Sequence, residues 1–185
     1  MKVKEVIISA LHMLGRNELA AKLKSGEELD AEQSDAVDTL LYCYNAVEDE
    51  VARKYIPLST TENLKTSDGI FYFQAFAKTP VAIKRVLSDG AAVEYELFPL
   101  YIHVNATNVT IEYEYVPKKK KIDSDSDFGG EASEYMLAAG MAAEYCLING
   151  EIEASEQWEQ KYRQRVDRAQ ARLTAGGYVM PRRWV

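Results

Sequence analysis

Apolar and polar residues alternate along the middle of the chain, where residues 70–117 predict an antiparallel sheet. Asp89-Gly90 separates two such runs, and a glycine that accepts positive φ at this place favours a hairpin turn. In the last run the apolar residues at every second position share one face: Val109, Ile111, Tyr113 and Tyr115. We therefore expect a half-buried sheet with one face in water.

The pattern predicts how the remaining strands pair. Residues 100–104 and 109–116 flank the polar turn 105–108, and we expect them to form a second hairpin. Residues 58–69 are polar and rich in turn-forming residues, so we expect them to lead into the sheet through residues 70–76.

Helical periodicity flanks this sheet on both sides. Residues 3–24 predict two short helices broken near Gly15, and residues 31–55 predict a long helix that Asp30 caps. Residues 132–148 are apolar on nearly every side, which indicates a helix buried in a core or against neighbouring subunits. A final amphipathic helix is expected over residues 152–174.

The order of these elements predicts an α+β fold in a single domain, residues 1–185. Its expected parts are a helical part (1–57), a β-sheet insertion (58–117), a charged loop (118–131), a helical hairpin (132–175) and a docking tail (176–185).

Composition narrows the classes of protein. The net charge of −7 argues against a general nucleic-acid binder, although it does not exclude a surface that DNA slides past. The chain has no apolar run long enough to span a bilayer, and its start does not match a signal peptide. We expect a protein made and kept in a cytoplasm, with Cys43 and Cys146 as buried reduced thiols.

An aspartate-rich loop is the candidate metal site. The oxygen ligands of a calcium loop would be Asp123, Asp125, Asp127 and Glu134. Phe128 stands where that loop requires glycine, and a strand precedes it instead of a helix. The favoured interpretation is a solvated loop whose acids offset four nearby lysines, with no metal bound.

Candidate catalytic residues are scarce. His12 and His103 lie in different predicted elements and match no metal-binding or catalytic motif. Nucleophile-elbow and phosphate-binding motifs are also missing from the sequence. We therefore expect no catalytic residue and no cofactor.

Charge is segregated along the chain. Residues 27–50 carry nine acids and no Lys or Arg, whereas the last helix and the tail are rich in arginine. The two helices could pack together within one chain or face solvent; alternatively, they meet head to tail between copies, which would close a ring. The candidate subunit contacts are Asp35, Asp38 and Glu48 on one side and Arg163, Arg165, Arg168 and Arg172 on the other.

The C-terminal segment combines aromatic side chains with arginine, as the centres of binding interfaces do. We predict that it docks into a partner; the alternatives are that it folds back onto its own sheet or frays. The candidate partner-binding residues are Tyr178, Met180, Arg182, Arg183, Trp184 and Val185.

A resemblance in order and spacing is carried by residues 47–57, 79–86, 109–117 and 138–160, especially 142–151 and 158–162. These segments resemble the head–tail connector (adaptor) proteins of tailed bacteriophages and prophages. The chain is most similar to the group of the podovirus tail tubular protein A.

This resemblance implies a homo-oligomer, a dodecameric ring beneath the portal protein that extends the DNA channel and gives the tail proteins a landing surface. It implies helices that line the ring, a sheet facing outward or tailward, and a C-terminal segment that reaches the portal. DNA would pass an acidic channel wall without specific binding. The location would be the virion, after synthesis in the cytoplasm of a bacterial host, with no membrane, enzymatic activity or cofactor.

Two other functions stay open. One is a soluble α+β enzyme, or a ligand- or metal-binding protein, with an unrecognised site. The other is a different tail-completion protein of similar construction.

Overall fold

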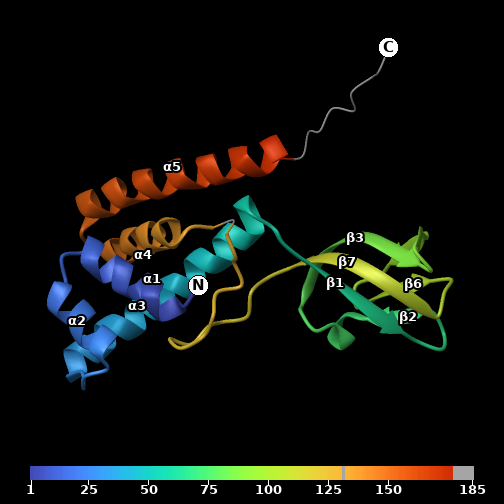
Figure 1. Cartoon of the computed structure of the whole chain (residues 1–185), viewed down its shortest axis with the longest axis horizontal. Coiled ribbons are helices and arrows are strands. Elements are labelled where there is room, and N and C mark those ends of the chain that lie inside the picture. The colour runs from blue at the N-terminus through green and yellow to red at the C-terminus, as the bar shows by residue number, and fades with distance from the viewer. Residues whose placement is uncertain (131, 177–185) are drawn as a thin grey trace, which may run out of the picture. The chain divides into compact units, whose positions relative to one another are not determined.

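The computed structural model describes residues 1–130 and 132–176, which form the helices and antiparallel sheets of an α+β protein (Figure 1). The chain divides into two compact units. Unit 1 contains residues 1–56 and the chain from residue 119 onward, and unit 2 contains residues 57–118. The insertion predicted from the sequence, residues 58–117, falls almost on these boundaries, while the prediction of a single domain stays a prediction.

Unit 1 is helical. Its helices are α1 (Val3–Met13), α2 (Asn17–Ser25), α3 (Ala31–Glu50), α4 (Glu134–Ile148) and α5 (Ile152–Gly176). A π-helical turn, Val51–Tyr55, continues α3. The predicted break near Gly15 is confirmed, since this residue has φ +72° between α1 and α2. The Asp30 side chain accepts a hydrogen bond from the Gln33 amide at 2.8 Å, so the predicted cap is confirmed as well.

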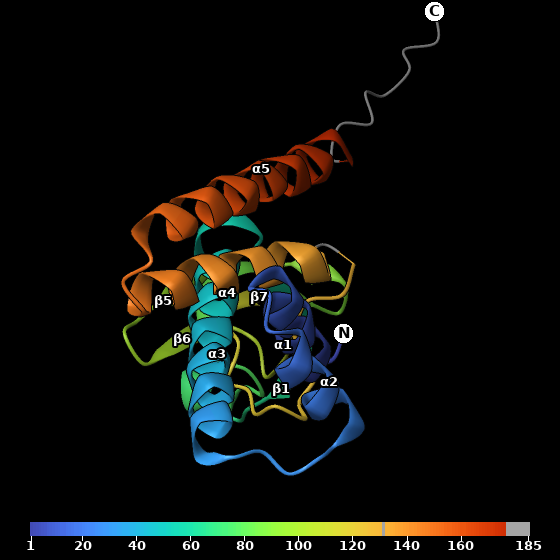
Figure 2. The same cartoon turned by 90° about the vertical axis from the view of Figure 1, so that its left-hand side faces the viewer.

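Helix α4 is the centre of unit 1. It lies between α5 on one side and α1 and α3 on the other (Figure 2). Because α4 has neighbours on several sides, it needs apolar residues around most of its circumference, as the sequence predicted. The buried residues of α4 are Met136 to Ala143, Tyr145 and Cys146.

Unit 2 holds two antiparallel sheets. The four-stranded sheet has the order β1-β7-β3-β4 and the three-stranded sheet has the order β2-β6-β5. The strands are β1 (Leu58–Lys65), β2 (Ile70–Tyr72), β3 (Pro80–Ser88), β4 (Ala91–Ala92), β5 (Tyr95–Leu97), β6 (Tyr101–Val104) and β7 (Asn108–Tyr115), with a 3₁₀ turn at Phe73–Ala75.

One face of strand β7 is buried in the core of unit 2, and it is the face that the alternation of apolar and polar residues predicted. Its four alternate apolar residues are all buried: Val109, Ile111, Tyr113 and Tyr115. The Tyr113 hydroxyl donates to Glu62 at 2.8 Å, and burial together with this carboxylate raises the pKa of Tyr113 to about 12. The other face of β7 is only half-buried, so the prediction of a sheet with one wet face is confirmed.

The predicted Asp89-Gly90 hairpin is confirmed, because both residues have positive φ, +51° and +82°, and Leu87 pairs with Ala92. The run after the turn does not stay in that sheet, however. Strand β4 ends at Ala92, and β5 joins β6 in the second sheet.

Two other strand predictions need correction. The predicted hairpin of residues 100–104 with 109–116 is wrong, since β6 pairs with β2 and β5 while β7 pairs with β1 and β3. The polar segment after Pro57 forms strand β1, which pairs with β7 along its full length. Strand β1 pairs with a strand far away in the sequence, whereas β6 forms a hairpin with β5, the strand before it, instead of with β7, the strand after it. The local turn pattern does not decide between these two neighbours.

Candidate protein-binding surfaces

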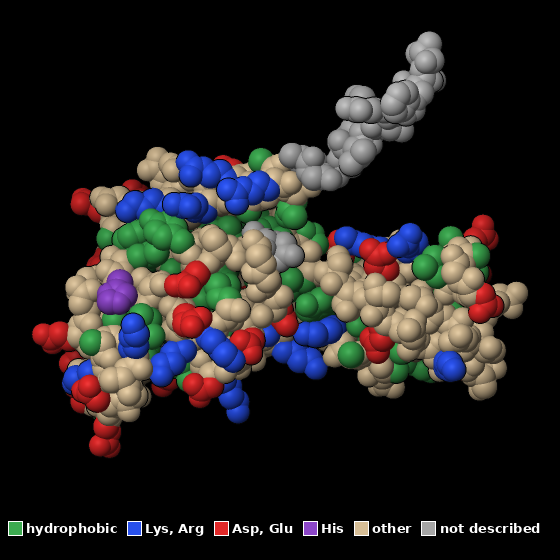
Figure 3. Space-filling model, in the orientation of Figure 1, with side chains coloured by type: hydrophobic (Ala, Val, Ile, Leu, Met, Phe, Trp, Pro, Cys, Tyr) green, Lys and Arg blue, Asp and Glu red, His purple; other side chains and the backbone are tan. Residues whose placement is uncertain are grey.

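Helix α5 carries a basic stripe along one side. Its residues are Lys161, Arg165, Arg168 and Arg172, all exposed. Their spacing of four, three and four residues places them on one face of a helix. The Lys161 amine lies 3.8 Å from the centroid of the Trp158 ring, and the Arg165 guanidinium lies 4.5 Å from that of Tyr135. Figure 3 shows Lys and Arg side chains gathered along α5.

Arg163 does not belong to this basic stripe. It donates to Glu159 at 2.6 Å, one helical turn earlier, on the other flank of α5. That flank faces α3, because Gln170 donates to the Tyr55 carbonyl at 3.2 Å and Tyr162 donates to Glu50 at 3.4 Å. Of the predicted arginines, Arg165, Arg168 and Arg172 therefore share one surface and Arg163 lies elsewhere.

Helix α3 carries an acidic stripe on its exposed side. Asp35, Asp38 and Asp49 recur there at helical spacing, with Tyr42 between them. Asp35 and Asp38 are exposed, whereas Asp49 is half-buried and pairs with Arg53 at 2.7 Å. The Tyr42 side chain is 69% exposed, although a large aromatic ring gains free energy when it is covered. The sequence prediction missed Tyr42; its signal is an aromatic residue on the polar side of an amphipathic helix.

Glu48 is a correction to the predicted subunit contacts. It is 1% exposed, and its carboxylate accepts hydrogen bonds from the Tyr44 hydroxyl at 2.8 Å, the Ser126 hydroxyl at 2.8 Å and the Asp127 amide at 3.1 Å. The helical pattern puts residue 48 on the buried side of α3, whereas Asp35 and Asp38 lie on its exposed side. Glu48 therefore stabilises its own chain and is not available to a second copy.

The acidic and basic stripes lie on different faces of unit 1. Both helices pack on α4, the acidic stripe is on the solvent side of α3, and the basic stripe is on the flank of α5 that faces away from α3. Asp35 to Asp49 spans about 21 Å along α3 and Lys161 to Arg172 about 16 Å along α5, at 1.5 Å per residue. The two surfaces are thus similar in length and opposite in charge.

A third group of acids lies where α3, α4 and α5 approach one another. Burial, Glu50 and Glu159 all raise the pKa of the Glu144 carboxyl, in that order of importance. Glu50 has a cation of its own, Lys54, at 2.9 Å. The α3-facing flank of α5 therefore carries paired charges of both signs, such as Glu159 with Arg163, in contrast to the basic stripe.

The aspartate-rich loop does not gather its carboxylates. Asp125 pairs with Lys2 at 2.9 Å and Asp127 pairs with Lys120 at 2.9 Å, while Glu134 accepts a hydrogen bond from Ser9. Asp123 is exposed. No group of three or more potential metal ligands occurs within residues 1–130 and 132–176.

This loop instead holds the N-terminus of the chain. The Val3 amide donates to the Ser124 carbonyl at 3.1 Å, and the Ser126 amide donates to the Met1 carbonyl at 3.0 Å. The hydrogen bond from Lys2 lowers the pKa of Asp125. The acids and lysines offset one another, as the solvated-loop interpretation has it, but they do so in a fixed arrangement.

The two histidines belong to different units, and each has a polar neighbour of its own. His12 is within 2.8 Å of Asn17 in unit 1, and His103 is 3.8 Å from Glu96 in unit 2. Burial is the main cause that raises the pKa of Cys43 to about 12 and of Cys146 to about 11. Such thiols are protonated at neutral pH and are poor nucleophiles.

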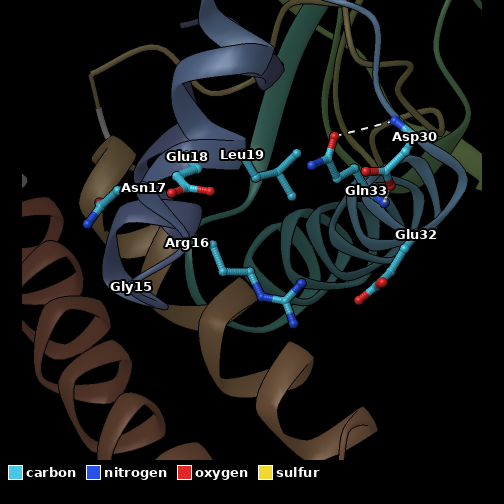
Figure 4. Close-up of a pocket in the computed structure, with 8 residues that line it drawn as sticks. All are labelled: Gly15, Arg16, Asn17, Glu18, Leu19, Asp30, Glu32 and Gln33. Atoms are coloured by element: carbon cyan, nitrogen blue, oxygen red, sulfur yellow. Dashed lines mark hydrogen bonds between the residues drawn. The ribbon is translucent and has the colours of Figure 1, made fainter.

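A depression of about 570 Å³ lies beside the turn between α1 and α2 (Figure 4). Arg16 lines it together with the carboxylates Glu18, Asp30 and Glu32. The Arg16 guanidinium lies 5.1 Å from the centroid of the Tyr145 ring, and Gln33 completes the cap of α3. The depression therefore presents both signs of charge, and its polar groups already serve the fold.

Unit 2 carries an apolar groove, which we define by its lining residues. The groove holds about 240 Å³ and is lined by Phe73, Pro80, Val81, Ala82, Ile83, Leu97, Phe98 and Pro99. Val81 is 55% exposed, Leu97 is 65% exposed and the neighbouring Leu100 is 72% exposed. Single exposed apolar side chains are common on protein surfaces, but a contiguous cluster of them marks a binding surface.

The predicted partner-binding residues of the C-terminal segment, Tyr178 to Val185, lie outside the described residues. The structure does not test their predicted role in binding a partner, which stays a prediction from the sequence.

Comparison with known protein families finds no family that matches the chain, and a search of curated proteins finds no match either. Among the helices of the described chain, none is both long enough and apolar enough to cross a membrane.

Proposed function

We propose that this protein is a structural virion protein, a head–tail connector whose copies form a ring between portal and tail. The observation that carries the proposal is the pair of stripes, acidic on α3 and basic on α5, on different faces of unit 1. A contact between two different complementary surfaces is heterologous, and repeating it closes a ring when the rotation between copies divides a full turn. The family resemblance supplies the biological setting.

Contacts between the two charged stripes alone would be weak, so we expect the ring to form when the portal aligns the copies. An exposed ion pair contributes about 0.2–1 kcal/mol, so a few pairs between the stripes orient two copies without binding them tightly. Tyr42 adds apolar area in the middle of the acidic stripe. Copies that are dilute and free would therefore stay monomeric, and a portal that aligns them would complete the ring.

The acidic character of the chain suits a DNA channel. A net charge of −7 per copy makes a wall that repels phosphates, so DNA passes without being held.

The test is the mass of the purified protein over a concentration series, by light scattering and native mass spectrometry, with and without the portal encoded beside it. A ring of about twelve copies, alone or only on the portal, would support the proposal. A protein that stays monomeric and does not bind that portal would overturn it.

Charge reversal tests the interface itself. We expect Arg168→Glu and Asp38→Arg each to weaken ring formation on the portal, because each places like charges opposite one another. Combining both substitutions should restore much of the loss, and added salt should weaken the wild-type ring. Lys24→Glu makes the same change of charge at an exposed site outside both stripes and is the matched control.

A further inference from the structure

The apolar groove of unit 2 has three features of a surface that receives an extended segment. Every residue that lines it is apolar, and Leu97 of its wall belongs to β5. Strand β5 is an edge of the three-stranded sheet, and all of its residues are exposed. An exposed strand edge offers unpaired backbone groups to another strand, and a neighbouring apolar pocket selects its side chains.

The surroundings of the groove are acidic. Residues 86–100, which supply three of its eight lining residues, contain three acids, Asp89, Glu94 and Glu96, and no Lys or Arg. The basic residues on the preceding strand are paired: Lys84 lies 3.0 Å from Glu114, and Arg85 lies 2.9 Å from Glu112. The segment that fits the groove therefore has bulky apolar side chains next to positive charge.

One segment of this chain has that composition. Residues 178–185 contain Tyr178, Val179, Met180, Trp184 and Val185 with Arg182 and Arg183, and no acid. This segment lies outside the described residues. Its apolar side chains match the groove, and its two arginines match Glu94 and Glu96.

We infer that the apolar groove of unit 2 binds the C-terminal segment, residues 178–185, of a second copy of the chain. The segment would lie along the exposed edge of β5 with apolar side chains in the groove, and one of its two adjacent arginines would face Glu94 and Glu96, which share one side of the strand. This inference rests on the proposed function in that it requires copies to assemble. It gives the segment a different binding surface from the portal that the family resemblance implies.

The experiment is photo-cross-linking in the full-length chain. Trp184 is replaced by the photoreactive amino acid benzoyl-phenylalanine, and ¹⁵N-labelled and unlabelled copies are mixed before irradiation. Mass spectrometry should find cross-links from position 184 to residues 80–83 or 97–100, joining labelled to unlabelled copies. Cross-links confined to unit 1, to a single copy, or to an added portal would overturn the inference.

A groove variant and a matched control variant test whether the cross-links depend on the apolar groove. We expect Leu97→Asp to lower the yield of these cross-links about tenfold, the loss typical of an apolar contact at the centre of an interface. Ile148→Asp makes the same kind of change at an apolar side chain of unit 1 that is 53% exposed, and it should leave the yield unchanged.

A charge swap serves if Leu97→Asp disturbs the fold. Arg182→Glu with Arg183→Glu should abolish the cross-links, and adding Glu94→Lys with Glu96→Lys should restore them. Failure of this rescue would contradict the inference. The stripe variants Arg168→Glu and Asp38→Arg separate the two proposals, because they test the ring contact in unit 1 and leave the groove intact.

Discussion

Glu48 joins two parts of unit 1 that are far apart in the sequence. Its carboxylate accepts one hydrogen bond from within α3 and two from residues 126 and 127 of the loop before α4. The same loop is held by Asn45, which accepts a hydrogen bond from the Lys120 amide at 2.6 Å. A buried carboxylate with several donors is expensive to remove, because each donor then loses its partner.

We therefore expect Glu48→Ala to lower the free energy of unfolding by about 2–4 kcal/mol. Asp38→Ala, an exposed carboxylate on the same helix, should change it by less than about 0.5 kcal/mol. Urea unfolding of both variants measures the difference. If both variants changed the free energy of unfolding by the same small amount, the hydrogen bonds of the Glu48 carboxylate would not stabilise the fold, and the prediction would be wrong.

Glu144 predicts a dependence of stability on pH. The pKa of this carboxyl is raised in the folded chain by burial and by Glu50 and Glu159. The Glu144 carboxyl therefore binds a proton more tightly in the folded state than in the unfolded state. As the pH rises from the unfolded pKa of this group through its folded pKa, the free energy of unfolding falls.

We expect Glu144→Gln to raise the melting temperature at pH 7, where it removes an ionised carboxylate from acidic surroundings. The gain should disappear once the pH is below the usual carboxyl range, where the wild-type side chain is neutral as well. Thermal unfolding from pH 7 down to a pH below the usual carboxyl range measures this, and a constant difference at every pH would contradict it.

At the scale of residues, the sequence shows the type of side chain more reliably than its neighbours. Asp35, Asp38, Arg165, Arg168 and Arg172 are exposed as predicted, because helical spacing separates the polar and apolar sides. Glu48 was predicted to be exposed because it is charged, but it is buried. Its carboxylate accepts hydrogen bonds from a loop that is distant in the sequence, and the local pattern does not show those donors.

Among the elements, α4 depends on one glycine at its crossing with α3 and α5. A Cβ atom on Gly140 would lie 2.9 Å from Cγ1 of Val47 and 3.1 Å from Cδ2 of Tyr162. Both neighbours are buried, so they have little room to move away. Gly140 thus allows three helices to pack closely at one point.

We expect Gly140→Ala to lower the free energy of unfolding by about 1–2 kcal/mol, since overpacking outweighs the better helix propensity of alanine. In the Gly140→Ala background, Val47→Ala should cost less than it does in the wild type, because it makes room for the new methyl group. A double-mutant cycle by urea unfolding measures this coupling. Additive effects would argue against the close crossing.

The elements also show where sequence patterns reach their limit. Strand β7 was predictable because its alternation of apolar and polar residues is complete along its length. Strand β1 has only Leu58 and Leu64 as apolar residues, and its pairing with β7 makes it a strand. Strand β6 lies just before β7 and yet pairs with β5, the strand before it, and with the distant β2, so the local pattern does not show which neighbour it joins.

For the whole molecule, the sequence gives the α+β class and the limits of the inserted sheet, because changes of periodicity mark both. It does not show that the insertion contains two sheets, since that depends on which strands pair. The apolar groove was missed for the same reason: its residues come from β3, from the turn after β2 and from the end of β5, and only the fold assembles them.

Unit 2 begins and ends at one place, because Leu58, at the start of β1, faces Tyr115, at the end of β7. Paired residues on neighbouring strands have Cα atoms about 5 Å apart. The chain that leaves unit 1 at residue 56 therefore returns to it with little distance to cover. An insertion of this form can be lengthened, shortened or exchanged as a cassette during evolution, since the host helices need only a short closing loop in its place.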